Sequence, residues 1–342
     1  MIPLGVTPAR MFAGKNVILA YHSLSETEPG KRCDSGYVSP RQRTSVRLFR
    51  KQLDWLSQFA DFVSLNDIVT PTSSDQWRVA VTFDDGYRDN VELGLPLFRR
   101  YEVPVTWFLS TQFIEERNYL PWWDLVDYIA QHVRGTVEVT VGGRARSYSF
   151  GAQDERNRFR RDMREAFRNG DWSSCEALRE NLRAECNRFT SLPSNAFADR
   201  ESVVQAASSP WISIGGHTIS HLNLAEVSPR RLQYEVTKGR EQLREWTGKP
   251  LEWFAYPYGG ESAHDEATRR VVRESGFKGA VTASRGYISE ASDVFALPRF
   301  MVPSWAGMPG FKAGVLALNQ VNWLVQNASR RMRRLRDLLT FL

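Results

Sequence analysis

The chain has few cysteines and no long apolar run. Its three cysteines, Cys33, Cys175 and Cys186, are odd in number and do not have the spacing of a metal motif, so we expect reduced thiols and no disulfide framework. Near the N-terminus the only apolar run, residues 17–21, has the length of a strand. We therefore expect no secretory signal and no membrane-spanning helix, and we expect a cytoplasmic protein.

The composition does provide material for a sizeable core. The 342 residues are 42% hydrophobic and include 11 Trp, 11 Tyr and 19 Phe, which excludes a disordered chain. The formal net charge of +6 is a mild excess that is compatible with an anionic partner. The basic residues are scattered or confined to the C-terminal tail, and no known nucleic-acid-binding module is recognised, so a nucleic-acid role is not expected.

Short apolar runs alternate with helical patterns over most of the chain. Such alternation predicts an α/β fold with a parallel sheet or barrel. We expect helices at 45–59, 91–101, 228–246 and 265–274, and strands at 17–21, 62–65, 77–83, 103–109, 211–214, 252–256, 277–282 and 294–301.

Residues 119–205 break this rhythm. A helical start at 119–133, a hairpin around Gly142 and Gly143, and a charged helical stretch at 154–189 indicate a mainly helical insertion on one face of the main domain. The segment PWWDLVD contains Trp122 and Trp123. It either packs its helix against the main domain or forms a wall on which a sugar ring stacks.

The C-terminal segment 304–342 predicts a basic amphipathic helix. It carries five arginines between Arg330 and Arg336 and an apolar stripe made of Val315, Leu318, Val321, Leu324 and Val325. The helix either docks on the domain with a solvated basic face or lies at an anionic lipid surface.

Two adjacent aspartates directly follow the expected strand at 77–83. Asp84 and Asp85 repel each other, and a buried carboxylate without a partner is costly. With Gly86 behind them, they are typical of an ordinary turn. A nearby cation would instead favour the ionised form of both groups, so a metal site is the other interpretation.

Two of the five histidines, His217 and His221, lie in GGHTISH after the expected strand at 211–214. This spacing can bring both rings to one ion, and the glycine pair would allow a sharp turn at the strand end. Two imidazoles usually share a divalent metal with an anionic ligand. One aspartate of the pair could bind the metal while the other acts as a base in metal-assisted hydrolysis.

Three segments resemble the first three motifs of the NodB-like polysaccharide deacetylases, carbohydrate esterase family 4. They are TFDDG at 82–86, HTISH at 217–221 and FAYPYG at 254–259, and they occur in the family's order. The resemblance covers roughly residues 15–110 and 205–303. It implies a distorted (β/α)7 barrel and the removal of acetyl groups from sugars with a divalent metal, often zinc.

The resemblance also implies roles for single residues. Asp84 matches the catalytic base, and the backbone N–H of Tyr258 matches a donor to the oxyanion. Residues expected to line the sugar site are Trp107, Trp123 and Pro257. The metal ligands would be Asp85, His217 and His221, with zinc as the expected ion and nickel, cobalt or manganese as alternatives.

The chain departs from the family pattern at two places. The third motif usually has an arginine where Ala255 stands, and Arg299 in LPRF is our candidate replacement. The usual C-terminal histidine motif is absent, because no histidine follows His264. ILAYH at 18–22 resembles the N-terminal strand of the permuted branch that includes poly-N-acetylglucosamine deacetylases. His22 is therefore our candidate general acid, unless it only ends a strand.

The function predicted in this way is metal-dependent removal of N-acetyl groups from a sugar or polysaccharide, with release of acetate. The alternatives are a deacylase of another amide, formyl or cyclic imide, and a non-catalytic glycan-binding relative. Expected substrates are an N-acetylated glycan or a lipid-linked or nucleotide-linked amino sugar, with membrane contact through the basic tail. His132 and His264 are expected to be solvated.

Overall fold

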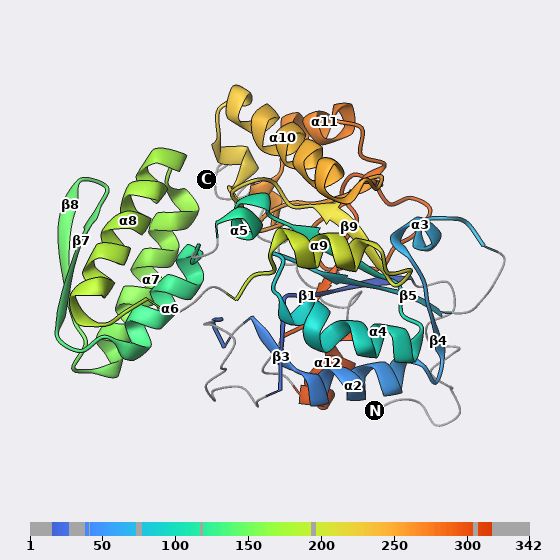
Figure 1. The fold of residues 1–342 in the computed structure, drawn as a ribbon, viewed down its shortest axis with the longest axis horizontal. Coiled ribbons are helices and arrows are strands. Elements are labelled where there is room, and N and C mark those ends of the chain that lie inside the picture. Colours follow the sequence, from blue (N-terminus) through green and yellow to red (C-terminus); the bar gives the residue numbers. More distant parts are fainter. Residues whose placement is uncertain are drawn as a thin grey trace, which may run out of the picture.

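The computed structural model describes residues 16–26, 38–40, 42–72, 77–116, 119–192, 196–303 and 307–316. Its centre is an eight-stranded sheet whose main path runs β11-β10-β9-β6-β5-β1-β12, with β4 paired to β5 (Figure 1). Every pair in this sheet is parallel. The strands are β1 (Val17–Tyr21), β4 (Ala60–Phe62), β5 (Trp77–Phe83), β6 (Val105–Leu109), β9 (Ile212–Gly216), β10 (Trp253–Ala255), β11 (Gly279–Val281) and β12 (Phe300–Met301).

One short segment joins the two ends of this sheet. Leu297 forms a parallel bridge with Val281 of β11, and three residues later Phe300 pairs with Leu19 of β1. The segment 297–301 thus contains β12, the strand at one end of the sheet, and also contacts β11 at the other end, which curls the sheet into a barrel-like form. The predicted α/β fold of the distorted barrel type is confirmed.

Most of the predicted strands are present, and those at 17–21 and 77–83 have the predicted bounds. Their side chains are buried on both faces, as expected for parallel strands covered by helices. The strand expected at 62–65 is wrong, because β4 ends at Phe62. Ser64 then accepts a hydrogen bond from the Asp67 N–H and begins helix α3 (Leu65–Ile68).

The predicted helices of the main domain are confirmed, and their ends follow capping chemistry. Ser228 accepts from the Arg231 N–H at the start of α10, and Gly248 ends that helix in the left-handed region. The helices of the main domain are α2 (Val46–Leu56), α4 (Leu95–Tyr101), α5 (Thr111–Glu115), α9 (Arg200–Ala207), α10 (Pro229–Thr247), α11 (Glu266–Glu274) and α12 (Gly307–Leu316). A π-helix, η1 (Asn90–Gly94), precedes α4.

The insertion has a hydrophobic core of its own, in which Leu125, Ile129, Val137, Phe159 and Leu182 are buried together. It lies to one side of the sheet (Figure 1). It consists of α6 (Trp122–His132), the hairpin β7 (Thr136–Val141) and β8 (Arg144–Ser149), α7 (Gln153–Asn169) and α8 (Trp172–Phe189). Helix α9 packs against α10 and β9, so the main domain resumes before residue 205.

The predicted C-terminal helix is described only in part. Helix α12 ends at Leu316, and Val315 is buried in the main core. The arginine-rich part of the tail lies outside the described residues. In the part of the chain that the structure covers, no helix has both the length and the apolar character needed to cross a membrane.

Gly215 and Gly216 belong to β9, and neither has a positive φ. The expectation that they make a sharp turn is wrong. A Cβ on Gly215 would lie 2.4 Å from the Phe108 ring, and one on Gly216 would lie 2.9 Å from the Phe277 ring. Both glycines let aromatic rings pack against the strand, and the chain turns only at Thr218, where φ is 67°.

We predict that Gly215→Ala lowers the free energy of unfolding by about 1–3 kcal/mol, because the added methyl group overpacks the core. Denaturant unfolding measures this. Gly151→Ala is the matched control, since a Cβ at Gly151 meets nothing within 4 Å. Equal stabilities of the two variants would contradict the packing role of Gly215.

Candidate active site

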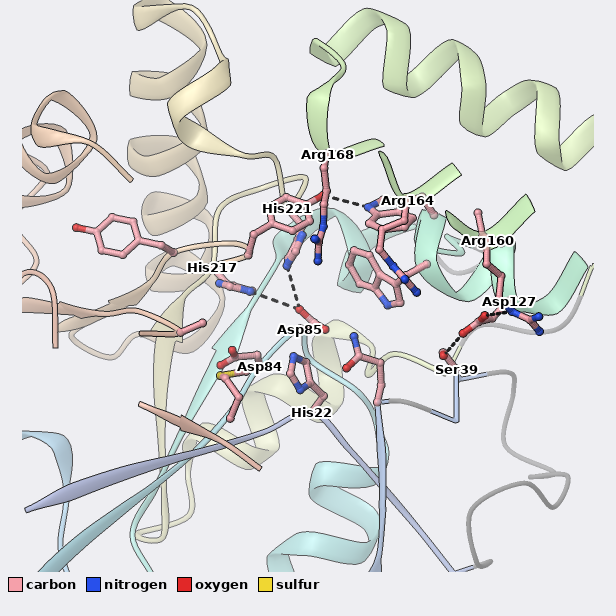
Figure 2. Close-up of a pocket in the computed structure, with 18 of the residues that line it drawn as sticks. His22, Ser39, Asp84, Asp85, Asp127, Arg160, Arg164, Arg168, His217 and His221 are labelled. Atoms are coloured by element: carbon pink, nitrogen blue, oxygen red, sulfur yellow. Dashed lines mark hydrogen bonds and ion pairs between the residues drawn. The ribbon is translucent and has the colours of Figure 1, made fainter. Parts of the chain in front are cut away.

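The candidate site residues gather where the parallel strands end. His22 follows β1, Asp84 and Asp85 follow β5, and His217 follows β9. Because the carboxyl ends of parallel strands meet at one edge of a sheet, these side chains converge there. They line a cavity of about 500 Å³ together with residues of the insertion (Figure 2).

Asp85, His217 and His221 form a group whose ligand atoms all lie within 4.8 Å of one another. Each histidine Nε2 is 3.4 Å from the same oxygen, Oδ1 of Asp85. The Asp85 side chain is fully buried, and within the described residues neither of its oxygens accepts a hydrogen bond. A buried carboxylate without donors needs a cation, so this group fits a divalent metal.

The protonation of the two histidines agrees with metal binding. His217 Nδ1 lies 2.7 Å from the Ala255 carbonyl oxygen, which can only accept, so the proton is on Nδ1 and the Nε2 lone pair faces Asp85. Burial lowers the pKa of His221 to about 3, even though Asp85 acts in the opposite direction. His221 is therefore available as a neutral ligand at pH 7, and Nε2 is the nitrogen through which His217 would bind a metal.

Several residues of the site have a left-handed backbone. Asp85, Thr218, His221 and Tyr258 have φ values of 74°, 67°, 56° and 63°. They are four of the five residues other than glycine with positive φ in the described part of the chain. Such residues cost about 1–3 kcal/mol each, so the surrounding structure must hold them in place.

Glu235 of α10 holds the loop that carries both histidines. Its carboxylate accepts hydrogen bonds from the N–H groups of Ile219 and Ser220, at 2.9 and 3.0 Å, and from the Ser220 hydroxyl. Arg231, one helical turn earlier, pairs with Glu235 at 2.7 Å. We did not predict this role, and the four-residue spacing of Arg231 and Glu235 was its only sequence signal.

Asp84 pairs with Arg299 and not with the metal group. Two hydrogen bonds of 2.7 and 2.8 Å join the guanidinium to both carboxylate oxygens. Burial would raise the pKa of Asp84, but the charge and hydrogen bonds of Arg299 outweigh it and hold that pKa below its usual value. Arg299 also donates to the Thr82 hydroxyl and the Thr282 carbonyl. It thus supplies the guanidinium that Ala255 cannot.

His22 lines the same cavity, and its backbone and the strand after it are held by Asp89 and Asn90, which follow the TFDDG motif. The Asn90 amide donates to the His22 carbonyl at 2.7 Å. Asp89 accepts from the Ser23 hydroxyl at 2.6 Å and from the Leu24 N–H at 2.7 Å. Strand β2 (Ser23–Ser25), which pairs with β3 (Arg43–Ser45), is anchored in this way. We did not predict the roles of Asp89 and Asn90.

The insertion forms one wall of the cavity. The Trp122 indole donates to the Tyr258 hydroxyl at 3.0 Å, and the Trp123 indole donates to the Tyr87 hydroxyl at 3.1 Å. The Trp123 ring also stands edge-on to His221, with centroids 4.8 Å apart. Both tryptophans therefore tie α6 to the main domain and line the cavity, so the two interpretations of PWWDLVD are compatible.

Three other expectations are wrong. Trp107 does not line the sugar site, because along β6 it points with Val105 and Leu109 into the main core and is 1% exposed. Pro257 is buried and is not among the cavity residues. His264 is not solvated, because its ring stacks on Tyr256 and is 8% exposed. His132 is half-buried and contacts Tyr128.

We predict that the purified protein retains about one zinc ion per chain after dialysis and that His217→Ala loses it, because two ligands hold the ion less tightly than three. Elemental analysis measures the retained metal. His132→Ala removes a histidine from the insertion and should keep the ion. Equal zinc contents in both variants would show that the metal binds elsewhere.

A family model described as polysaccharide deacetylase matches residues 72–168 and 177–280 of the chain. A search of the curated proteins finds no match. Solved structures with the same fold include the Aggregatibacter actinomycetemcomitans de-N-acetylase, with 14% identity, coverage of 88% of this chain and 99% of that one, and a TM-score of 0.56.

Two further structures share the fold at similarly low identity. IcaB from Ammonifex degensii has 18% identity, coverage of 89% and 97%, and a TM-score of 0.54. The Streptococcus pyogenes deacetylase PplD, solved in complex with acetate, has 15% identity, coverage of 88% and 98%, and a TM-score of 0.51.

Proposed function

Because the chain belongs to the polysaccharide deacetylase family and is a hydrolase of carbon–nitrogen bonds, we propose that it removes N-acetyl groups from an amino sugar with the help of a divalent metal. The main support is the buried group of Asp85, His217 and His221 beside an aspartate that Arg299 keeps ionised. We propose zinc as the metal, with nickel, cobalt or manganese as alternatives. The substrate is an N-acetylated glycan or a lipid-linked or nucleotide-linked amino sugar.

Asp85, His217 and His221 would hold the metal. When bound there, a divalent ion would polarise the acetyl carbonyl and lower the pKa of a nearby water molecule. The backbone N–H of Tyr258 has no hydrogen-bond acceptor among the described residues and would donate to the carbonyl oxygen as it becomes negative. The left-handed φ of Tyr258 sets the direction of this N–H.

Asp84 and His22 would move the protons. Asp84 takes a proton from the water molecule whose oxygen attacks the carbonyl carbon. His22, protonated, gives a proton to the sugar nitrogen as the carbon–nitrogen bond breaks. The products are acetate and the free amino group of the sugar. His22 and Asp84 both line the cavity and come from adjacent strand ends.

The arginine missing from the third motif was the best support for a non-catalytic relative. The ion pair between Arg299 and Asp84 removes that support, because the guanidinium is present although it comes from the residue before β12. Acetate release is therefore the activity to test first, and formate release can be measured in the same assay to cover a formyl amide.

We predict that Asp84→Asn lowers the rate of acetate release by about 10²–10⁴-fold, because an amide cannot accept the proton. The assay measures acetate from N-acetylated sugars with zinc and after chelation. Asp154→Asn, at the exposed start of α7, should keep the wild-type rate. Full activity of the Asp84 variant would exclude Asp84 as the base.

A second prediction concerns pH. Asp84 can act as a base only when it is ionised, and Arg299 keeps its pKa below 3.8. As far as Asp84 limits the reaction, the wild-type rate should therefore fall only below about pH 4. In Arg299→Gln the guanidinium no longer opposes the effect of burial, and only the smaller effects of His217 and His22 still do. The pKa of Asp84 should therefore rise, which moves the acid limb of kcat/KM to higher pH.

The pH profile of kcat/KM, measured from about pH 3 to about pH 9 so that the wild-type acid limb is included, tests this shift. Arg299→Lys keeps a positive charge, so its acid limb should lie between those of the wild type and the glutamine variant. Acid limbs at the same pH in all three proteins would show that Arg299 does not control the ionisation of the base.

A further inference from the structure

Helix α7 presents only arginines to the cavity. Arg160, Arg164 and Arg168 line it, and no other residue of this helix does. They are four residues apart and therefore share one helix face, with a rise of about 6 Å from each to the next. Figure 2 shows the three side chains reaching from the insertion toward the cavity.

The acidic partners on α7 lie on its other faces. Asp162 pairs with Arg146 at 3.5 Å and accepts a hydrogen bond from the Tyr148 hydroxyl. Glu155 pairs with Arg158. The helix face formed by Arg160, Arg164 and Arg168 thus differs from an ordinary solvated face, on which charges of both signs alternate.

The carboxylates that line the cavity already have cations or a metal role. Asp84 is bound by Arg299, and Asp127 is bound by Arg160 at 2.8 Å. Asp85 belongs to the metal group. Arg168 has no hydrogen-bond or ion-pair partner among the described residues, and its charge acts on the nearby Tyr258 hydroxyl. With a metal bound, the cavity is positive along the side formed by α7.

We propose that Arg164 and Arg168 bind a phosphate group attached to the N-acetylated sugar, so that the substrates are phosphate-linked amino sugars. This inference rests on the proposed function, because it concerns the same cavity. Guanidinium groups bind phosphate in a planar, bidentate manner. A phosphate has more oxygens than one guanidinium fills, so two arginines one turn apart can share it.

Substrates without a phosphate fit the side of the cavity that Arg164 and Arg168 line less well. A single guanidinium already fills both oxygens of the carboxylate of an acidic glycan. A polymer of free amino sugars would be positive and repelled by the arginines. Lipid-linked and nucleotide-linked amino sugars both carry a phosphate, so Arg164 and Arg168 suit both. The cavity volume of about 500 Å³ is in the range of small-molecule sites.

Binding tests the inference without turnover. Calorimetry with N-acetylglucosamine 1-phosphate should give an affinity at least about tenfold weaker for zinc-loaded Arg168→Gln than for the zinc-loaded wild type, since a charge-assisted pair is worth about 1.5–3 kcal/mol. Arg161→Gln is the matched control, because Arg161 is on the same helix, exposed and paired with Asp162. It should bind like the wild type.

Any attraction between zinc and the phosphate is common to all three proteins, so the difference between variants isolates Arg168. The inference is overturned if both variants bind like the wild type or are weakened equally. It is also overturned if the wild type binds the phosphate compound no more tightly than N-acetylglucosamine.

Turnover then identifies the source of the phosphate. Acetate release is compared among UDP-N-acetylglucosamine, a polyprenyl-diphosphate-linked N-acetylglucosamine in detergent, a neutral N-acetylglucosamine oligosaccharide and a uronate-containing one. A higher kcat/KM for either phosphate compound supports the inference, and equal or higher values for an oligosaccharide overturn it. Phosphate binding that depends on Arg168 but leads to no acetate from any substrate would refute the proposed function and leave the inference standing.

Discussion

Two neighbouring buried carboxylates can both stay ionised only when each has its own positive partner. Asp84 has Arg299, which holds both of its oxygens. Asp85 faces two imidazoles and has no hydrogen-bond donor among the described residues, so this group fits a divalent metal as its partner. This division makes the two aspartates different, because it suits Asp84 to the proposed role of base and Asp85 to the proposed role of metal ligand. Contacts from the rest of the site maintain the division.

The separate partners of Asp84 and Asp85 are kept in place by contacts from segments that are distant in the sequence. Arg299 reaches Asp84 because the segment 297–301 bridges β11 and β1 where the sheet curls up. Glu235 holds the histidine loop through two backbone N–H groups, and Asn90 holds the backbone of His22. These contacts offset the cost of the left-handed residues Asp85, Thr218, His221 and Tyr258.

The insertion contributes to the site as well as to the fold. It has a separate core, yet Trp122 and Trp123 bond to tyrosines of the main domain beside the metal ligands. Its helix α7 contributes Arg160, Arg164 and Arg168 to the lining of the cavity that also contains Asp84 and Asp85. The proposed metal ligands and the arginines proposed to bind phosphate thus come from different parts of the chain, so the arginines can vary without changing the metal ligands.

The sequence by itself was sufficient for the strands 17–21 and 77–83, the capped helices and the metal group, because these depend on neighbours in the chain and on motifs at strand ends. Packing between distant segments decided the rest. Trp107 points into the main core, and Gly215 makes room for the ring of Phe108 on the neighbouring strand. From the sequence, Arg299 was only a candidate partner of Asp84, and the curl of the sheet brings the two side chains together. The spacing of Arg160, Arg164 and Arg168 was visible in the sequence. Which face of that helix meets the cavity is set by tertiary contacts, since spacing alone fixes a helix face but not what it faces.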